Sequence, residues 1–503
     1  MSDSNLYRLS YVPETTLGTT PAIAGLVAMR STRITGESLV HTIQNVVSDE
    51  LRSDRQIPDM IQISGQGGGG INFELHHPAY RAFHDDMLQA ALFNNWDIIA
   101  RKHNITAANE NVSVAVTTGI YTINSGGAAF LSGHVVMASG FTNAANNGIF
   151  TVSASTGTTV TTSNTSSVSE ASPPVGATLE VLGIQGASAD IAATTAGGTN
   201  NLTCTAADFV ALGFKAGDYI KIGDASNAIF GFSNALLNVF ARVVTVAAKI
   251  MTLDTLPSTT TWAADAGTGK TIRIFRSDRL INGIVRKSFT LERGYLDHTV
   301  PSYLVHTGMM VNELGLQLQA GAIIKGNYNF MGMGHSTSTT SLGTPENPST
   351  EQVMSSGANV ADLLEAGASQ ASPNLVNSLQ VKVSNNLRIL QAVGAVAGVG
   401  MGLGRCEVSG SLNAYFGNLN LYNKYVSGAE TSLYTRTYAP IPSSVIASGQ
   451  RVFAIGIPLM EYESGQASAG QSNSDIFAQL GFKAKRHPTF NASIILHRFS
   501  YAN

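Results

Sequence analysis

A glycine-rich stretch, a group of histidines and aspartates, and a run of opposite charges are the three parts of this chain that could do chemistry. The first, Gly65 to Gly70, has the glycine content of a loop that surrounds phosphate groups. No Lys-Ser or Lys-Thr pair follows it, and the residues on both sides alternate as strands do. The pattern therefore predicts a β-hairpin from Ile61 to Leu75, with Gly67 to Gly70 at its centre, and no phosphate site.

Residue types that bind metals follow this hairpin closely. Three imidazoles and two carboxylates are candidates: His76, His77, His84, Asp85 and Asp86. In a strand, however, His76 and His77 would point to opposite faces, and a helix starting at Pro78 would interrupt a regular ligand spacing. The pattern therefore favours polar contacts at a surface or interface, with no metal and no cofactor.

Opposite charges crowd the segment from Ser48 to Met60. They are Asp49, Glu50, Arg52, Asp54, Arg55 and Asp59. No partnered nucleophile accompanies them, and neither Gly-x-Ser-x-Gly nor His-Glu-x-x-His occurs in the chain, so no enzymatic activity is predicted. Two interpretations remain open for this segment, a solvated loop or a loop that sets the register of a neighbouring copy by charge pairing.

The composition indicates a surface that meets other protein. Only 13% of the 503 residues are charged and 50 are glycine, whereas about 25% are charged in an average soluble protein. The net charge of −3 gives no general basic surface for nucleic acid. Cys204 and Cys406 fit neither a disulfide framework nor a zinc spacing, so both are expected to be free thiols. The N-terminus has no signal pattern and no long apolar run occurs, which predicts synthesis in a cytoplasm and no membrane span.

Two distant parts of the chain repeat one order of elements. Each has strands, a short helix or turn, and then long alternating strands; the segments that look most alike are 311–330 and 474–499. An apolar stripe in the first part predicts a helix from Pro78, with Phe83, Met87, Leu88, Ala91 and Leu92 on one side. The predicted organisation is a first domain in two halves, 1–104 and 279–335, an insert at 105–278, a polar linker at 336–375 and a second domain at 376–503.

The insert is rich in Thr, Ser, Ala and Gly, and strand-length pieces between Asn and Gly turns predict an all-β structure. It contains a repeat of its own, Gly140-Phe-Thr-Asn-Ala and Gly231-Phe-Ser-Asn-Ala, with similar strands before and after each copy. Repetition of this kind predicts two small β-modules, at about 111–183 and 188–275.

Three segments of the first domain resemble a known family. They are GESLVHTIQNVVSDELRSDRQIPDM (36–60), DDMLQAAL (85–92) and NELGLQLQAGAIIKGNYNFMGMG (312–334). Together they resemble the major tail tube proteins of long-tailed, non-contractile bacteriophages. The resemblance implies β-sandwich domains with a flanking helix, whose inner sheets join into rings that stack into a conduit for genome delivery. It also implies a place in the virion tail, and tape measure, tail terminator and distal tail proteins as partners.

The resemblance and the repeat together predict an assembly. Two tube domains per chain allow three chains to supply six wall segments, so a homotrimeric, pseudo-hexameric ring is predicted, with a homohexamer as the alternative. DNA should pass a neutral to acidic bore without tight binding, and Glu37, Glu313 and Glu407 are the candidate lining residues. The insert is expected outside the tube, and the charged loop of 48–60 at the contact between rings.

Two other functions are weighed against the tube. The Thr/Ser/Gly-rich modules also suit a β-rich virion decoration or cell-surface adhesion protein. A carbohydrate-active β-sandwich enzyme is disfavoured, because no pair of carboxylates marks a sugar site and the only tryptophans are Trp96 and Trp262.

Overall fold

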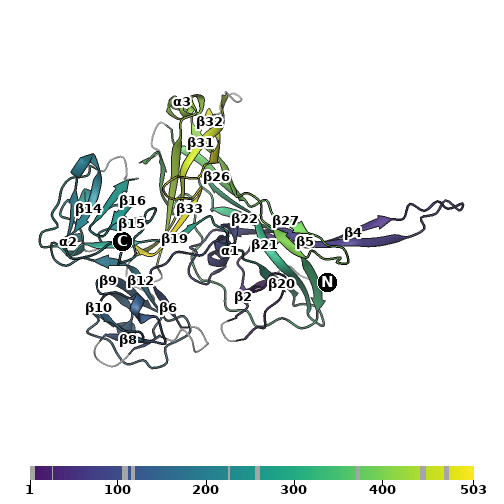
Figure 1. The fold of residues 1–503 in the computed structure, drawn as a ribbon, viewed down its shortest axis with the longest axis horizontal. Coiled ribbons are helices and arrows are strands. Elements are labelled where there is room, and N and C mark those ends of the chain that lie inside the picture. Colours follow the sequence, from purple (N-terminus) through teal and green to yellow (C-terminus); the bar gives the residue numbers. More distant parts are fainter. Residues whose placement is uncertain are drawn as a thin grey trace.

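The computed structural model describes residues 6–24, 27–104, 112–114, 119–224, 227–254, 261–369, 374–441, 449–468 and 475–502. Within them the chain consists of antiparallel strands in two large sheets with a few short helices (Figure 1). The predicted mainly β fold is confirmed. The start of the predicted insert at residue 105, and the first residue of its first module, lie outside the described residues.

Two units share the larger sheet, and the hairpin at 388–402 in the second unit forms a small sheet of its own. Unit 1 consists of β1 (Tyr7–Pro13), β2 (Arg30–Ser31), β3 (Gly36–Glu37), β4 (Val40–Val47), β5 (Met60–Glu74), α1 (Phe83–Ala91), β20 (Phe289–Tyr295), β21 (Ser302–Gln319), β22 (Lys325–Gly332) and β23 (Gly334–Ser338). Unit 2 consists of β24 (Val360–Glu365), β25 (Ala368–Ser369), β26 (Val376–Ser384), β27 (Arg388–Leu390), β28 (Gly400–Gly402), β29 (Glu407–Tyr415), α3 (Asn420–Ser427), β30 (Thr431–Pro440), β31 (Gln450–Ser468), β32 (Phe477–Ala484) and β33 (Ile495–Ala502).

Both units have one topology. In unit 1 the strands pair in the order β4-β5-β22-β21, and in unit 2 in the order β26-β29-β32-β31. The first halves of β21 and β31 leave these sheets and enter a second layer, which we call the cover sheet of each unit. The cover sheets have the orders β1-β20-β21-β23 and β24-β30-β31-β33. Each unit is therefore a two-layered sandwich built on one long strand that belongs to both layers.

Two β-bulges fix the correspondence between the units residue by residue. The residues that flank the first bulge are Phe289, Leu291, His306 and Met309 in unit 1 and Thr431, Leu433, Ile457 and Met460 in unit 2. Those that flank the second are Val311, Glu313, Asn329 and Phe330 in unit 1 and Tyr462, Ser464, Gly481 and Phe482 in unit 2. A bulge shifts the alternation of faces, so two bulges at matching places indicate one fold formed twice.

The correspondence corrects the sequence comparison by one strand. Segment 311–330, which contains the end of β21 and β22, corresponds to β31 and β32 and not to segment 474–499, which contains β32 and β33. The error has a physical source, because several of these half-buried strands have the same alternation and aromatic ends.

The two units are joined edge to edge by β21 and β26. Leu314 faces Val383 and Leu316 faces Val381 across this pairing. It turns the two four-stranded sheets into one continuous sheet, the joint sheet, with the strand order β4-β5-β22-β21-β26-β29-β32-β31.

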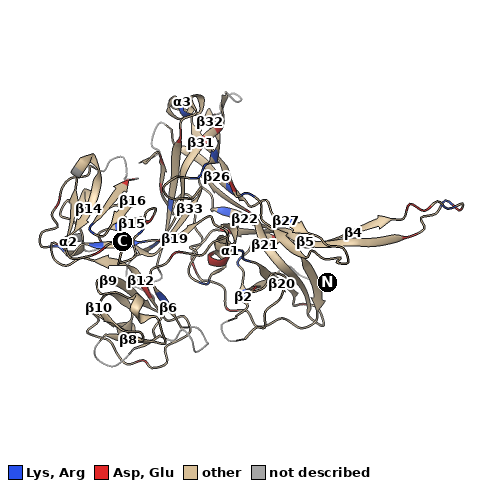
Figure 2. Cartoon of the chain, viewed as in Figure 1, with Lys and Arg blue, Asp and Glu red and all other residues tan. Residues whose placement is uncertain are grey.

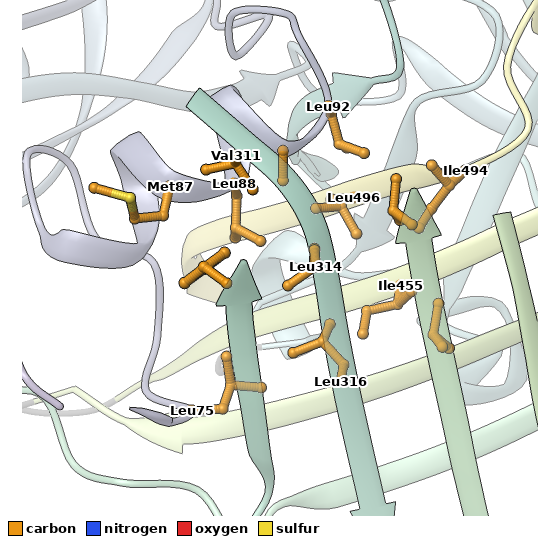
Figure 3. Packing of buried hydrophobic residues seen from close by; sticks show 14 of the residues in the cluster. Leu75, Met87, Leu88, Leu92, Val311, Leu314, Leu316, Ile455, Ile494 and Leu496 are labelled. Atoms are coloured by element: carbon orange, nitrogen blue, oxygen red, sulfur yellow. The ribbon is translucent and has the colours of Figure 1, made fainter. Parts of the chain in front are cut away.

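A shared apolar core lies between the joint sheet and the cover sheets. In Figure 3, Leu88 of α1 lies next to Val311 and Leu314 of β21, and Ile455 and Leu496 of unit 2 lie close by. The helix begins at Phe83 and not at Pro78 as predicted. Turns at Ala79 and Ala82 and a positive φ of 62° at Arg81 occupy the residues before it, and they prevent a regular helix there.

The glycine-rich stretch is not a hairpin centre. Gly67 to Gly70 lie inside the single strand β5, between β22 on one side and β4 with the residues that precede it on the other. A Cβ atom at Gly69 would lie 2.2 Å from the carbonyl oxygen of Ser38. The glycines therefore permit a close approach of the neighbouring backbone. The alternation of residue types in the sequence is the same for such a strand as for two strands joined by a glycine turn, so it could not distinguish the two.

The insert forms the second large sheet. Its elements are β6 (Arg101–His103), β7 (Val112–Val114), β8 (Ile120–Ile123), β9 (His134–Ser139), β10 (Gly148–Ser155), β11 (Thr159–Thr162), β12 (Thr178–Gln185), β13 (Ile191–Thr194), β14 (Asn200–Cys204), β15 (Tyr219–Ile222), α2 (Asn227–Phe230), β16 (Phe240–Ala247), β17 (Ile250–Asp254) and β18 (Arg273–Arg276). After it, β19 (Asp278–Ile281) pairs with β33 and leads back to unit 1.

The internal repeat of the insert has matching geometry. The Asn147 side chain accepts a hydrogen bond from the backbone N–H of Phe141 at 2.9 Å and donates one to its carbonyl at 2.8 Å. Asn238 makes the same two contacts with Phe232, at 2.8 and 3.0 Å. The two similar sequences thus form the same side-chain-locked turn.

The segment 336–375, which the sequence presents as a polar linker, contains regular structure. Part of β23 lies in it, and β24 joins the cover sheet of unit 2 by pairing with β30. Apolar residues make this possible, since Leu363 packs against the core and Leu364 is buried.

Candidate assembly surfaces

The face of the joint sheet that points away from the core is polar. On β21 the leucines at 314, 316 and 318 are buried, whereas Glu313 and Gln317 line a hollow on the opposite face. The same hollow is lined from unit 2 by Lys382, Ser409 and Ser411. Strand alternation thus places a continuous polar surface across both units.

Glu313 and Glu407 stand on this polar face. Glu313 forms an ion pair with Lys382 at 2.9 Å. Partial burial opposes its ionisation, but hydrogen bonds from Lys382 and Asn329 hold the pKa of Glu313 below its ordinary value. Glu407, Ser409 and Ser411 occupy every second position of β29 and therefore share one face of the strand. Hydrogen bonding from Arg405 lowers the pKa of Glu407 as well.

Glu37 is not brought together with these two carboxylates. Its side chain contacts Arg293 of β20 at 2.5 Å and therefore turns toward the cover sheet of unit 1. Sequence alternation around residue 37 could not show this, because β3 is only two residues long.

The joint sheet ends in two strand edges without a described partner strand. At one end, β4 pairs with β5, and at the other end, residues 464–468 of β31 pair with β32. Neither has a second partner strand in the described part of the chain. An open edge offers backbone N–H and C=O groups to another chain. The sequence comparison did not single out residues 464–468, because nothing in their types distinguishes an edge strand from a central one.

The ends of β4 and β5 form a long arm. It consists of residues 43–63 and projects from the body of the molecule on the side away from the insert (Figure 1). Its apolar side chains are each at least 42% exposed: Ile43, Val46, Val47, Leu51, Ile57, Met60, Ile61 and Ile63. Exposed apolar residues in such number mark a surface that binds protein.

The predicted contact residues all lie in the loop at the tip of the arm. Asp49, Glu50, Arg52, Asp54, Arg55 and Asp59 are exposed there, and Figure 2 shows both signs of charge in this loop. Arg52 and Asp54 pair with each other at 2.8 Å, which lowers the pKa of Asp54 through the hydrogen bond from Arg52. The sequence identified the tip but missed the apolar shaft, whose exposure depends on how far the hairpin projects.

The histidine and aspartate group is part of the core. The His76 and His84 imidazoles are 4.3 Å apart, and burial lowers the pKa of His76 to about 4. Asp85 pairs with Arg498 and Asp86 pairs with Arg30. In the ranges that the structure describes, no group of three or more His, Cys, Asp or Glu residues could hold a metal ion. These residues tie α1 to the neighbouring strands.

The chain is similar to a known protein family. A protein-family model described as phage tail tube protein matches residues 4–228 and, a second time, residues 223–484. No curated protein matches the chain. No helix in the described residues is long and apolar enough to cross a membrane.

Proposed function

Because the chain belongs to the phage tail tube protein family, and is thus a structural component of a virion tail, we propose that three copies form one ring of the tube of a long, non-contractile tail. The observation that carries the proposal is the β21–β26 pairing, which joins the two units of equivalent topology edge to edge within one chain. Each chain therefore already contains two of the wall segments that a closed ring needs.

The same pairing predicts the contact between chains. Residues 464–468 of β31 correspond to residues 313–317 of β21, and residues 38–42 correspond to 380–384 in β26. If the intermolecular joint repeats the internal one, residues 464–468 of one chain pair with residues 38–42 of the next. Both open edges are then satisfied, and the ring closes after three chains and six segments.

The polar face of the joint sheet is the lining of the proposed bore. Glu313 and Glu407 stand on it, whereas Glu37 is excluded because its carboxylate faces the cover sheet. Here acidic and basic residues neutralise one another, as in the pair of Glu313 and Lys382. Such a face repels the passing duplex weakly and does not hold its phosphates.

The insert is the exterior part of the proposed tube. Its Val135, Leu182 and Phe275 pack against Val452 and Phe499 of the cover sheet of unit 2. This cover sheet lies on the other side of the core from the polar face. The insert, predicted as two modules within 105–278, therefore decorates the outside of a wall formed by domains at 1–104 with 279–335 and at 376–503.

The tip of the arm is assigned to contacts between stacked rings. Its exposed charges, Asp49, Glu50, Arg52, Asp54, Arg55 and Asp59, are suited to fixing register rather than to providing most of the affinity. The tape measure, terminator and distal tail proteins that accompany such tubes are the further partners of this chain under the same proposal.

Electron microscopy of the purified chain in negative stain tests the proposed function. Rings or tubes with an open centre are the expected result. Monomers that bind host cells or glycans would instead establish a decoration or adhesion protein.

A further inference from the structure

Unit 2 contacts unit 1 through a hairpin, and unit 1 has an equivalent hairpin that projects from the body of the molecule. The hairpin of β27 and β28, which connects β26 to β29 in unit 2, lies back over unit 1, whereas the arm projects free of the body (Figure 1). The backbone N–H of Gly65 donates to the carbonyl of Val396 at 2.9 Å, and Leu387 and Met401 are buried against Phe93 and Met310.

The arm is the equivalent of this hairpin in unit 1. The facing residues Val40 and Gly68 correspond to Lys382 and Ser409. Farther along the same strands, the pair of Val46 and Ile61 corresponds to the pair of Arg388 and Gly402, because each lies the same number of residues beyond the first pair. The apolar hairpin residues that cluster with unit 1 are Leu387, Ile389, Met401 and Leu403, and their equivalents in the arm are Asn45, Val47, Met60 and Gln62.

The surface under the hairpin has an equivalent too. The hairpin covers Met310 and Met331, which are cross-strand partners in unit 1, together with Met333. The corresponding residues of unit 2 are Glu461 and Lys483, again cross-strand partners, and Lys485. Lys485 is exposed and forms ion pairs with Glu461 at 2.5 Å and with Glu430 at 3.1 Å.

Both sides of the contact become more polar together. Within the chain, Leu387 and Leu403 meet methionines. In the equivalent pair of surfaces the leucines are replaced by Asn45 and Gln62, and the methionines by Glu461, Lys483 and Lys485. An apolar hairpin thus matches an apolar surface, and an arm that keeps Val47 and Met60 but carries amides at Asn45 and Gln62 matches a charged surface.

We propose that the shaft of the arm, through Asn45, Val47, Met60 and Gln62, binds the surface of Glu461, Lys483 and Lys485 on unit 2 of the preceding chain in the same ring. The inference rests on the proposed ring and adds its second lateral contact. The internal joint also fixes the direction, because β26 lies next to unit 1 of its own chain just as β4 would lie next to unit 2 of the preceding chain. The tip then extends past the neighbouring chain, where it is free to meet another ring.

Cysteine cross-linking tests this contact. Gln62→Cys combined with Lys483→Cys, in a background with Cys406→Ser, is assembled into tubes and treated with a short bismaleimide. The expected products are covalent dimers and trimers, with no larger species, because the three arms of a ring bind within that ring. The matched control is Leu403→Cys with Met331→Cys, the equivalent internal pair, which should cross-link within one chain, so that the denatured protein keeps the mass of one chain plus the linker.

The outcomes separate the contact from the function. Normal tubes without interchain cross-links, both for this pair and for a second pair of Asn45→Cys with Lys485→Cys, would overturn the docking and leave the tube intact. Products longer than trimers would also overturn it, because the arm would then bind another ring. If the unmodified chain forms no rings or tubes, the proposed function fails and the docking fails with it.

Discussion

At the scale of single residues, buried ion pairs tie the insert to both units. Asp278 lies between Arg101 of β6 and Arg498 of β33, with oxygen to nitrogen distances of 2.8 and 2.9 Å. Arg498 also pairs with Asp85 of α1. Burial disfavours the charged form of Asp278, but the two arginines outweigh this and hold the pKa of its carboxyl below the ordinary value.

Replacing this carboxylate should be costly. We expect Asp278→Asn to lower the free energy of unfolding by about 3 kcal/mol, because two buried guanidinium groups lose their shared counter-charge. Urea unfolding of the unassembled subunit measures this change. Asp49→Asn at the exposed tip is the control and should change stability by less than about 0.5 kcal/mol. Equal effects of both substitutions would show that the ion pairs of Asp278 contribute little.

The same pair predicts a pH dependence. A carboxyl group whose pKa is lowered by folding adds stability above its unfolded pKa, and this stability is lost as the pH falls through the folded pKa. The difference in stability between wild type and Asp278→Asn should therefore be constant near neutral pH and shrink in acid below about pH 4. A difference that grew on acidification would contradict the assignment.

Residue types alone identified part of the candidate surfaces. The charged tip was predictable because six charged residues in one short polar segment are difficult to bury together. The role of Glu37 was not, because it depends on Arg293, which is far away in the sequence and close only in the folded chain.

At the scale of elements, close strand packing explains the glycines of β5. Gly69 has a φ of 121°, and a Cβ there would meet the backbone of Ser38 and Leu39. We expect Gly69→Ala to destabilise the subunit by about 3 kcal/mol, the sum of backbone strain and steric overlap. Gly357→Ala is the control, because no atom lies within 4 Å of the position that its added methyl group would take, and it should be tolerated. Equal thermal stability of the two variants would argue against the close packing.

The tip of the arm makes a separate prediction. Arg52→Glu with Arg55→Glu should leave the circular dichroism of the unassembled subunit unchanged, because exposed charges contribute little to folding. It should shorten the tubes seen by electron microscopy through like-charge repulsion at the ring contact. A control with the same change in charge is Lys249→Glu with Lys270→Glu on the insert. Tubes of normal length from the tip variant would indicate that this loop is exposed to solvent and makes no contact between rings.

The order of elements was predictable where alternation was long and regular. β26, β29, β31 and β32 follow the predicted sequence of strands, and α3 stands where a turn or short helix was expected. The alignment of the two units slipped by a strand because neighbouring strands carry the same pattern, and only the bulges, which appear in the pairing, fix it. The helix start at Pro78 failed for a local reason, the positive φ at Arg81.

At the scale of the whole molecule, the layers separate the proposed bore from the exterior. Removing residues 106–273 would expose Val452, Phe499 and the other apolar residues that the insert covers. The insert is therefore integrated into unit 2 and is more than an appended decoration. Its composition predicted an all-β fold, but no sequence pattern indicated which sheet it would cover.

The bore should not bind DNA. Assembled tubes mixed with short duplexes at low salt should retain little DNA, because acidic residues stand on the polar face and Glu313 pairs with Lys382 there. Co-sedimentation measures the bound fraction, and a variant with Ser409→Lys and Ser411→Lys on the same face provides a positive control. Salt-dependent binding by the unmodified tube that equals binding by this variant would contradict the proposed lining.

The number of chains in one ring tests the central claim most directly. Mass photometry of single rings, supported by a cryo-electron microscopy reconstruction without imposed symmetry, should give three times the chain mass of 52.7 kDa and three inserts around the circumference. Each ring should then show six similar wall segments, joined alternately within and between chains. A ring of six chains would contradict the account, because the β21–β26 joint would then not be the repeat unit of a six-segment wall.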